Sequence, residues 1–136
     1  MDKMNIRKAA MIGCGFVGAS SAFALMQSGI FSEMVMIDAD HAKAEGEAMD
    51  LSHGLPFVHP MKIYAGTYAD LADCFLIIIT AGAGQRPGET RLELVRKNVE
   101  IFRDMLALLN RESLIYAFSC KALPCQTGIV NLELVL

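Results

Sequence analysis

Three glycines with the spacing Gly-x-Gly-x-x-Gly, at Gly13, Gly15 and Gly18, could hold a phosphate group. In such a motif the first glycine allows a tight turn, the second lets the backbone approach a pyrophosphate, and the third lets a following helix pack closely. The N–H groups and the positive dipole end of that helix then face the phosphates. The alternative is an ordinary glycine turn, because 11 of the 136 residues are glycine.

A carboxylate at Asp38 follows the next apolar segment, Met34–Ile37, and lies about 20 residues beyond the last glycine of the motif. A carboxylate in this place can accept hydrogen bonds from the 2′-hydroxyl of an adenosine ribose. It would repel the additional phosphate of a 2′-phosphorylated cofactor. The pattern therefore indicates NAD rather than NADP. The alternative is a solvated turn residue.

A polar, glycine-rich loop comes directly after the apolar segment Cys74–Ile79 and has the sequence Thr80-Ala-Gly-Ala-Gly-Gln-Arg-Pro-Gly-Glu-Thr-Arg91. In open α/β sheets, ligands bind beyond the carboxyl ends of the strands. Loops of this kind often act as lids over such sites. Arg91, at the junction of this loop and a following helix, is therefore a candidate ligand-binding cation.

These residues need a sheet to position them, and hydrophobic periodicity predicts one. Strands are expected at 9–12, 34–37, 63–65, 74–79, 114–118 and 129–135, and helices at 16–28, 42–51 and 91–110, with a short helix within 66–73. Their alternation predicts an α/β fold: a partial doubly wound parallel sheet with helices on both faces. The helix from residue 91 is expected to bury a stripe of six apolar residues, Leu92, Val95, Val99, Phe102, Leu106 and Leu109.

Length and composition predict a single domain with a substantial core, since 54% of the 136 residues are apolar. No apolar run reaches the roughly 18–20 residues of a membrane span, and no secretory signal is evident, so a cytoplasmic protein without a membrane partner is expected. A net charge of −3 without a basic block argues against nucleic-acid binding. The four cysteines lack metal-ligand spacing, which predicts reduced thiols and no metal.

Four segments together resemble the NAD-dependent L-lactate dehydrogenases, within the lactate/malate dehydrogenase superfamily. They are Ile12–Gly18, Met36–Asp38, Ala44–Gly54 and Ile79–Leu92, and Asn98–Phe102 continues the match. The resemblance covers roughly residues 4–105. It implies a Rossmann-type fold, NAD as cofactor, a small 2-keto or 2-hydroxy acid as substrate, and the interconversion of pyruvate and L-lactate, as in glycolysis and fermentation.

The resemblance also implies roles for individual residues. Cofactor contacts would come from Gly13, Gly15, Val17 and Gly18 at the pyrophosphate, Asp38 at the adenosine ribose, Lys43 and Tyr68 at further cofactor-side positions, and Gly82 and Ala83 beneath the nicotinamide half. The family is usually tetrameric, and its helix around Glu45–Leu51 lies at a subunit contact.

Two residues of the loop would contact the substrate. Gln85 takes the position that faces the C3 group of the substrate, where malate dehydrogenases carry an arginine that pairs with a second carboxylate. A neutral amide cannot neutralise that charge, so Gln85 favours pyruvate over oxaloacetate, and a malate dehydrogenase-type enzyme is the alternative. Arg91 would be the catalytic lid arginine, which polarises the substrate carbonyl and stabilises alkoxide charge as the hydride arrives.

Residues 106–136 depart from the family pattern and lack its Val-x-Asn-Pro-Val-Asp type segment. The acid/base histidine and the arginine that clamps the substrate carboxylate lie in the C-terminal half in this family, and both are needed for turnover. His41, His53 and His59 lack a comparable context and are expected to be solvated. The expectations are a truncated or frameshifted lactate dehydrogenase, a non-catalytic NAD-binding remnant, or a chain that folds poorly because sheet edges stay open.

Overall fold

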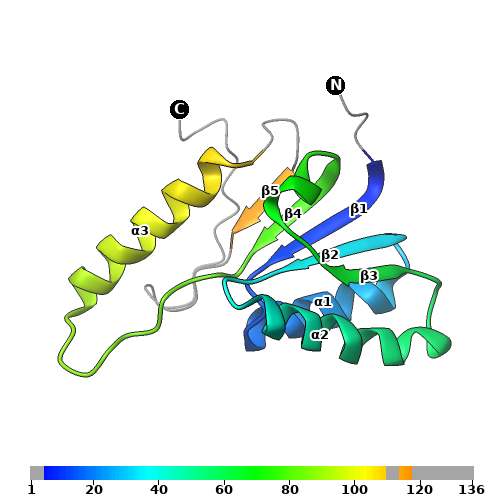
Figure 1. The fold of residues 1–136 in the computed structure, drawn as a ribbon, viewed down its shortest axis with the longest axis horizontal. Helices are drawn as coiled ribbons and strands as arrows, with labels where there is room; N and C mark the ends of the chain where they lie inside the picture. The colour runs from blue at the N-terminus through cyan, green and yellow to red at the C-terminus, as the bar shows by residue number, and fades with distance from the viewer. Residues whose placement is uncertain (1–4, 110–113, 118–136) are drawn as a thin grey trace.

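The computed structural model describes residues 5–109 and 114–117, which form one parallel sheet with helices on both faces (Figure 1). The elements in chain order are β1 (Asn5–Ile12), α1 (Phe16–Ser28), β2 (Glu33–Ile37), α2 (His41–Gly54), the 3₁₀ helix η1 (Leu55–Phe57), β3 (Lys62–Ala65), the 3₁₀ helix η2 (Tyr68–Leu71), β4 (Cys74–Ile79), α3 (Arg91–Ala107) and β5 (Leu114–Ala117). The predicted order of strands and helices is confirmed over this range. The strand predicted at 129–135 lies outside the described residues.

Some predicted boundaries were too short. β1 begins at Asn5 rather than at residue 9, because the polar residues that precede the apolar run also pair with neighbouring strands. α2 extends through residues 52–54, which were expected to be loop, and η1 follows it directly. Proline at the second position of η1 suits the start of a helical turn, since its missing N–H would have no partner there.

The strand order is β3-β2-β1-β4-β5, and every pair is parallel. The chain moves outward from β1 through β2 to β3, then crosses back over β1 to form β4 and β5. The order therefore reverses between β1 and β4, which is the switch point where doubly wound sheets bind ligands. Ile12 pairs with both Ile37 and Ile79, so the carboxyl ends of β2, β1 and β4 lie level with one another.

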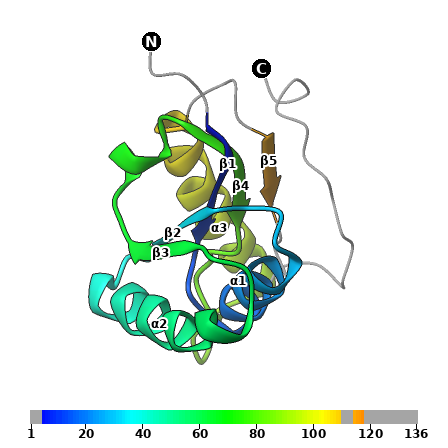
Figure 2. The ribbon, with the colours of Figure 1, turned by 90° about the vertical axis from the view of Figure 1, so that its right-hand side faces the viewer.

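Helices α1 and α2 pack on one face of the sheet, and η2 and α3 on the other (Figures 1 and 2). Alternate residues of β1 serve the two faces: Met11 packs toward α1 and α2, whereas Ala10 and Ile12 pack toward α3. A strand that is buried on both sides needs apolar residues at every position, which explains the continuous apolar run of β4.

The buried face of α3 differs from the predicted stripe. Leu94 and Met105 are buried, whereas Leu92 is 63% exposed and Val99 is 52% exposed. The helix is rotated so that Asn98, rather than Val99, faces the loop after β4, and its side chain accepts a hydrogen bond from that loop. The prediction was wrong at these two positions because apolar spacing alone allowed either face.

Candidate cofactor-binding site

The first glycine of the motif lies where β1 ends and β4 comes closest. Gly13 has φ = +99°, and a Cβ atom there would lie only 2.5 Å from the backbone nitrogen of Ala81. Its N–H donates to the carbonyl of Ile37 at 2.7 Å, and the Thr80 hydroxyl donates to its carbonyl at 2.8 Å. Both the positive φ and the close approach require glycine at this position.

The other two glycines differ from each other in what surrounds them. A Cβ atom on Gly18 would overlap the carbonyl oxygen of Gly13, so the fold requires glycine there as well. A Cβ atom on Gly15 would meet nothing within 4 Å, and its backbone conformation (φ −80°, ψ −171°) suits any residue. The fold therefore leaves an open space at Gly15, which a side chain would fill and a ligand can occupy.

The start of α1 presents hydrogen-bond donors to this space. Gly15 is the N-cap residue, and no side chain of residues 5–109 or 114–117 caps the helix. The first helical bond inside the turn runs from Ala19 N–H to the carbonyl of Gly15, so the earlier N–H groups of the first turn, including that of Val17, are left for a ligand. Open space beside uncapped N–H groups fits a pyrophosphate, which is the group that the glycine motif predicts.

Asp38 follows β2 and points its carboxylate at the glycine turn. Its Oδ2 accepts from the N–H of Cys14 at 2.7 Å, and its Oδ1 accepts from the N–H of Asp40 at 3.0 Å. Each carboxylate oxygen keeps capacity for a further bond, so ribose hydroxyls can still be bound. The pKa of Tyr68 is raised, first by burial and then by the charge of Asp38, which places the two groups within electrostatic reach.

Lys43 belongs to the same end of the sheet. It lies in the first turn of α2, where its N–H donates to the side chain of the N-cap residue Asp40. Its side chain is exposed, and its charge reaches Cys14. The structure thus gathers Asp38, Lys43 and Tyr68 beyond the end of β2, on one side of the glycine turn.

Cys14, inside the glycine turn, is fully buried, and its thiol donates to the carbonyl of Ile37 at 3.7 Å. Burial, and next the charge of Asp38, raises the pKa of this thiol to about 11. The thiol is therefore neutral near pH 7 and is not a nucleophile. Over residues 5–109 and 114–117, no three His, Cys, Asp or Glu side chains are grouped as metal ligands would be.

The segment after β4 lies on the opposite side of β1 from Asp38. The N–H groups of Thr80 and Ala81 both donate to the carbonyl of Ile12, at 2.8 and 3.0 Å. Gly82 is exposed, and the N–H of Ala83 donates to Oδ1 of Asn98 at 2.8 Å. Gly82 and Ala83 therefore lie where the second half of a dinucleotide would extend from the glycine turn.

Sequence reasoning gave no role to Thr80 or Asn98, although both have a detectable signal. Thr80 is a hydroxyl residue between a buried strand and a glycine-rich loop, and Asn98 is an amide within the apolar pattern of a helix. Both side chains bond to backbone groups of the predicted site. Sequence could identify them as unusual but could not say what they contact.

The loop from residue 80 to 90 leaves the end of β4 and extends away from the sheet before α3 begins (Figure 1). Its tip is closed on itself: the amide of Gln85 donates to the carbonyl of Glu89 at 2.8 Å, and the N–H of Arg86 donates to the Glu89 carboxylate at 2.9 Å. Arg91 is exposed at the first position of α3, which a Thr90–Glu93 capping box fixes.

The two predicted substrate-side residues, Gln85 and Arg91, are therefore set apart from the cofactor-side residues. Within the described part of the chain, no hydrogen bond or ion pair joins either of them to the glycine turn. Closure of the loop would be needed to bring them to a ligand on the sheet edge.

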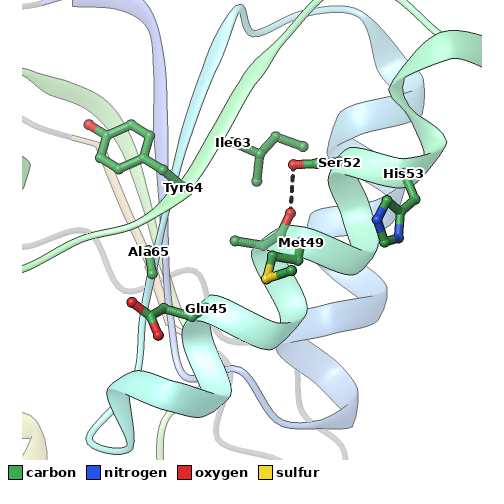
Figure 3. Close-up of a pocket in the computed structure, with 8 residues that line it drawn as sticks. Glu45, Met49, Ser52, His53, Ile63, Tyr64 and Ala65 are labelled. Atoms are coloured by element: carbon green, nitrogen blue, oxygen red, sulfur yellow. Dashed lines mark hydrogen bonds between the residues drawn. The ribbon is translucent and has the colours of Figure 1, made fainter.

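In the part of the chain that the structure describes, no histidine is held by a buried carboxylate. His41 Nδ1 lies 3.5 Å from a carboxylate oxygen of Glu45, a partner that sequence reasoning did not foresee, but both side chains are more than half exposed. His53 and Glu45 also line a hollow of about 620 Å³ between α2 and β3, together with Met49, Ser52 and Tyr64 (Figure 3). The hydroxyl of Ser52 is bonded within α2 to the carbonyl of Ala48, so it offers no activated nucleophile.

Comparison with known proteins agrees with the fold and with the glycine turn. Residues 7–127 match the family model described as lactate/malate dehydrogenase, NAD binding domain. The chain therefore belongs to this family of NAD-binding domains. It is 62% identical over 96 residues to an L-lactate dehydrogenase of Priestia megaterium, covering 71% of this chain and 30% of that protein. It is 53% identical over 104 residues to an L-lactate dehydrogenase of a Thermoanaerobacter strain, covering 76% and 33%.

Solved structures give the same class. A lactate dehydrogenase from a Medee basin deep-sea metagenome library superimposes with a TM-score of 0.78 at 42% identity, covering 84% of this chain and 38% of that one. The malate dehydrogenase of Picrophilus torridus gives 0.75 at 28% identity, covering 81% and 37%. The chain spans about a third of the length of the curated relatives it matches. In the described residues, no helix is both long and apolar enough to cross a membrane.

Proposed function

We propose that the chain binds NAD(H) across the carboxyl ends of β2, β1 and β4, as a single cofactor-binding domain over residues 1–136 in which 106–136 is a divergent tail. The adenosine half lies toward Asp38, and the nicotinamide half lies toward Gly82 and Ala83. The observation that carries this proposal is the open space at Gly15, beside uncapped N–H groups and between two glycines that the fold itself requires.

The reaction that the chain serves is hydride transfer between NADH and pyruvate or L-lactate. NADH supplies the hydride, and the relatives named L-lactate dehydrogenase give the reaction class. Gln85 is neutral, which suits a 2-keto acid with a single carboxylate. Arg91 is an exposed cation where the loop joins α3, and a cation is the group that stabilises a developing alkoxide. We further propose a cytoplasmic setting in glycolysis and fermentation, and a homotetramer with α2 at a subunit contact.

Cofactor choice tests the binding proposal directly. Calorimetric titration of the chain should give a lower Kd for NADH than for NADPH by at least about tenfold, because the Asp38 carboxylate repels a 2′-phosphate. Asp38→Ser should reduce this preference by weakening NADH binding and relieving the repulsion. Asp50→Ser, which removes an exposed carboxylate of α2, should leave the preference unchanged. Equal affinities for NADH and NADPH in the wild-type chain would contradict the role of Asp38.

The malate dehydrogenase alternative has the structural likeness at 28% identity in its favour. NADH oxidation should therefore be followed with pyruvate and with oxaloacetate, using the chain alone and the chain mixed with the C-terminal part of a lactate dehydrogenase relative. A preference for pyruvate supports the role of Gln85, and a preference for oxaloacetate favours the malate class. If the chain binds NADH but neither the chain alone nor the mixture turns over pyruvate or oxaloacetate, the chain is a non-catalytic NAD-binding domain.

A further inference from the structure

Asn98 combines two unusual features in the middle of α3. Its Oδ1 accepts the N–H of Ala83 at 2.8 Å, which joins α3 to the loop after β4. Its Nδ2 is buried and has no hydrogen-bond partner among the residues that the structure describes. An unpaired buried donor is unfavourable, so the Nδ2 group does not explain why an amide stands at this position. The hydrogen bond that Oδ1 accepts from Ala83 explains the amide at this position.

The bond from Ala83 marks a boundary in the loop. Up to this residue, the backbone is tied to the rest of the protein: Thr80 and Ala81 bond to the end of β1, and Ala83 bonds to Asn98. Gly82 lies between these ties, and a Cβ atom there would be 3.5 Å from the same Asn98 oxygen. Between Ala83 and Thr90, the hydrogen bonds that the structure describes stay within the loop, as in the pairing of Gln85 with Glu89. Thr90 is bonded to Glu93 in the first turn of α3.

We propose that Asn98 is the positioning residue that fixes the base of this loop, so that residues 84–89 move between Ala83 and the capped start of α3 while Gly82 and Ala83 stay in place. This inference rests on the proposed function, because the fixed segment is the surface on which the nicotinamide half would lie. Asn98 does not contact substrate itself. It acts through the backbone of Ala83 and sets the geometry of one half of the dinucleotide site.

Hydrogen exchange tests the anchor without any ligand. Asn98→Leu keeps the approximate size of the side chain but removes the acceptor, so the amide of Ala83 should exchange at least about tenfold faster. Asn98→Asp replaces the unpaired donor by a second oxygen and adds a negative charge, but it keeps an acceptor for the N–H of Ala83, so protection of Ala83 should persist. Glu100→Leu, at an exposed position of the same helix, is the matched control. Unchanged protection of Ala83 in Asn98→Leu would overturn the proposal.

Binding of two probes tests the consequence. ADP occupies only the adenosine and pyrophosphate part of the site, whereas NADH occupies both halves. Asn98→Leu should weaken NADH binding by about tenfold and leave ADP binding within about twofold, with Asn98→Asp close to wild type. Equal weakening of both ligands would indicate a general loss of stability and overturn the positioning role. A wild-type chain that binds neither ligand refutes the proposed function, whereas the exchange of Ala83 still decides the anchor.

Discussion

The two ends of the parallel sheet differ in how completely their polar groups are paired. At the amino end, Lys8 is only 5% exposed, and its Nζ lies 2.6 Å from the Asp73 carboxylate and 3.8 Å from that of Glu33. Glu33 also accepts from the hydroxyl of Tyr64 at 2.9 Å, and Lys62 lies 3.9 Å away from it. The buried and half-buried charged groups at the amino end are therefore paired with one another.

At the carboxyl end, donors are left without partners in the described residues. The first turn of α1 has no capping side chain, Gly15 borders open space, and Nδ2 of Asn98 is buried and unpaired. Incomplete pairing reduces stability, and proteins tolerate it chiefly at functional sites. The amino end therefore contributes to the stability of the sheet, and the unpaired donors at the carboxyl end are what the proposed cofactor site requires.

Replacing Lys8 should produce the largest loss of stability. Lys8→Met leaves the carboxylates of Asp73 and Glu33 without their shared cation, and the free energy of unfolding should fall by about 2–3 kcal/mol. This loss of unfolding free energy is smaller than for a fully buried ion pair because the Asp73 side chain is 34% exposed. Urea denaturation measures the change, and the NADH affinity of the folded protein should stay within about twofold.

Lys62→Met is the matched control, since Lys62 is 70% exposed and lies 3.9 Å from the same Glu33. Exposed pairs contribute little, so its effect should be below about 0.5 kcal/mol. Equal losses in the two variants would show that burial does not distinguish the amino-end network from ordinary surface charges.

Gly15→Ala should have the converse effect, on binding rather than on folding. The new methyl group enters the open space where a pyrophosphate would lie, so the Kd for NADH should rise by about tenfold or more, or about 1.4 kcal/mol. The free energy of unfolding should change by less than about 1 kcal/mol, as expected at an N-cap position. Calorimetry and urea denaturation measure the two quantities separately.

Gly13→Ala provides the comparison within the same motif. Its positive φ alone should cost roughly 1–2 kcal/mol of stability, and contact with the backbone of Ala81 adds to this. If Gly15→Ala bound NADH as tightly as the wild-type chain, the open space would not be the phosphate site. This conclusion does not depend on the stability of Gly13→Ala.

Sequence alone predicted the elements whose signals are local. The limits of α1 and β4 agree with the predicted ranges, because a glycine closes α1 at φ = +68° and an unbroken apolar run defines β4. The level strand ends that set Asp38 beside the glycine turn follow from parallel topology. The roles of individual site residues in binding stay predictions, and the experiments above decide them.

Features that depend on distant residues could not be predicted. The apolar residues of α3 allow two overlapping stripes, and the choice between Asn98 and Val99 depends on a bond to Ala83 in another segment. The partners of Lys8 come from the starts of other strands, with no local pattern that links them. Loop composition likewise predicted a lid without predicting that Gln85 bonds to Glu89.

Alkaline pH should weaken the amino end through Tyr64 and Lys8. Burial, together with donation to Glu33, raises the pKa of Tyr64 to about 12. Burial alone would lower the pKa of Lys8, but its bond to Asp73 and nearby negative groups outweigh this and raise the pKa above its usual value. Both groups therefore hold their protons more tightly in the folded state than in the unfolded state.

The stabilisation from these protons is complete below about pH 10, where both groups stay protonated in the unfolded chain as well. It is lost as the pH rises from 10 toward 12, because the unfolded chain releases its protons first. Tyr64→Phe removes one of these protons and the bond to Glu33, so it should cost about 1 kcal/mol at pH 7 and make the alkaline decline shallower. Urea denaturation from pH 7 to 11 measures both effects, and parallel curves for the variant and the wild type would exclude Tyr64 as a source of the decline.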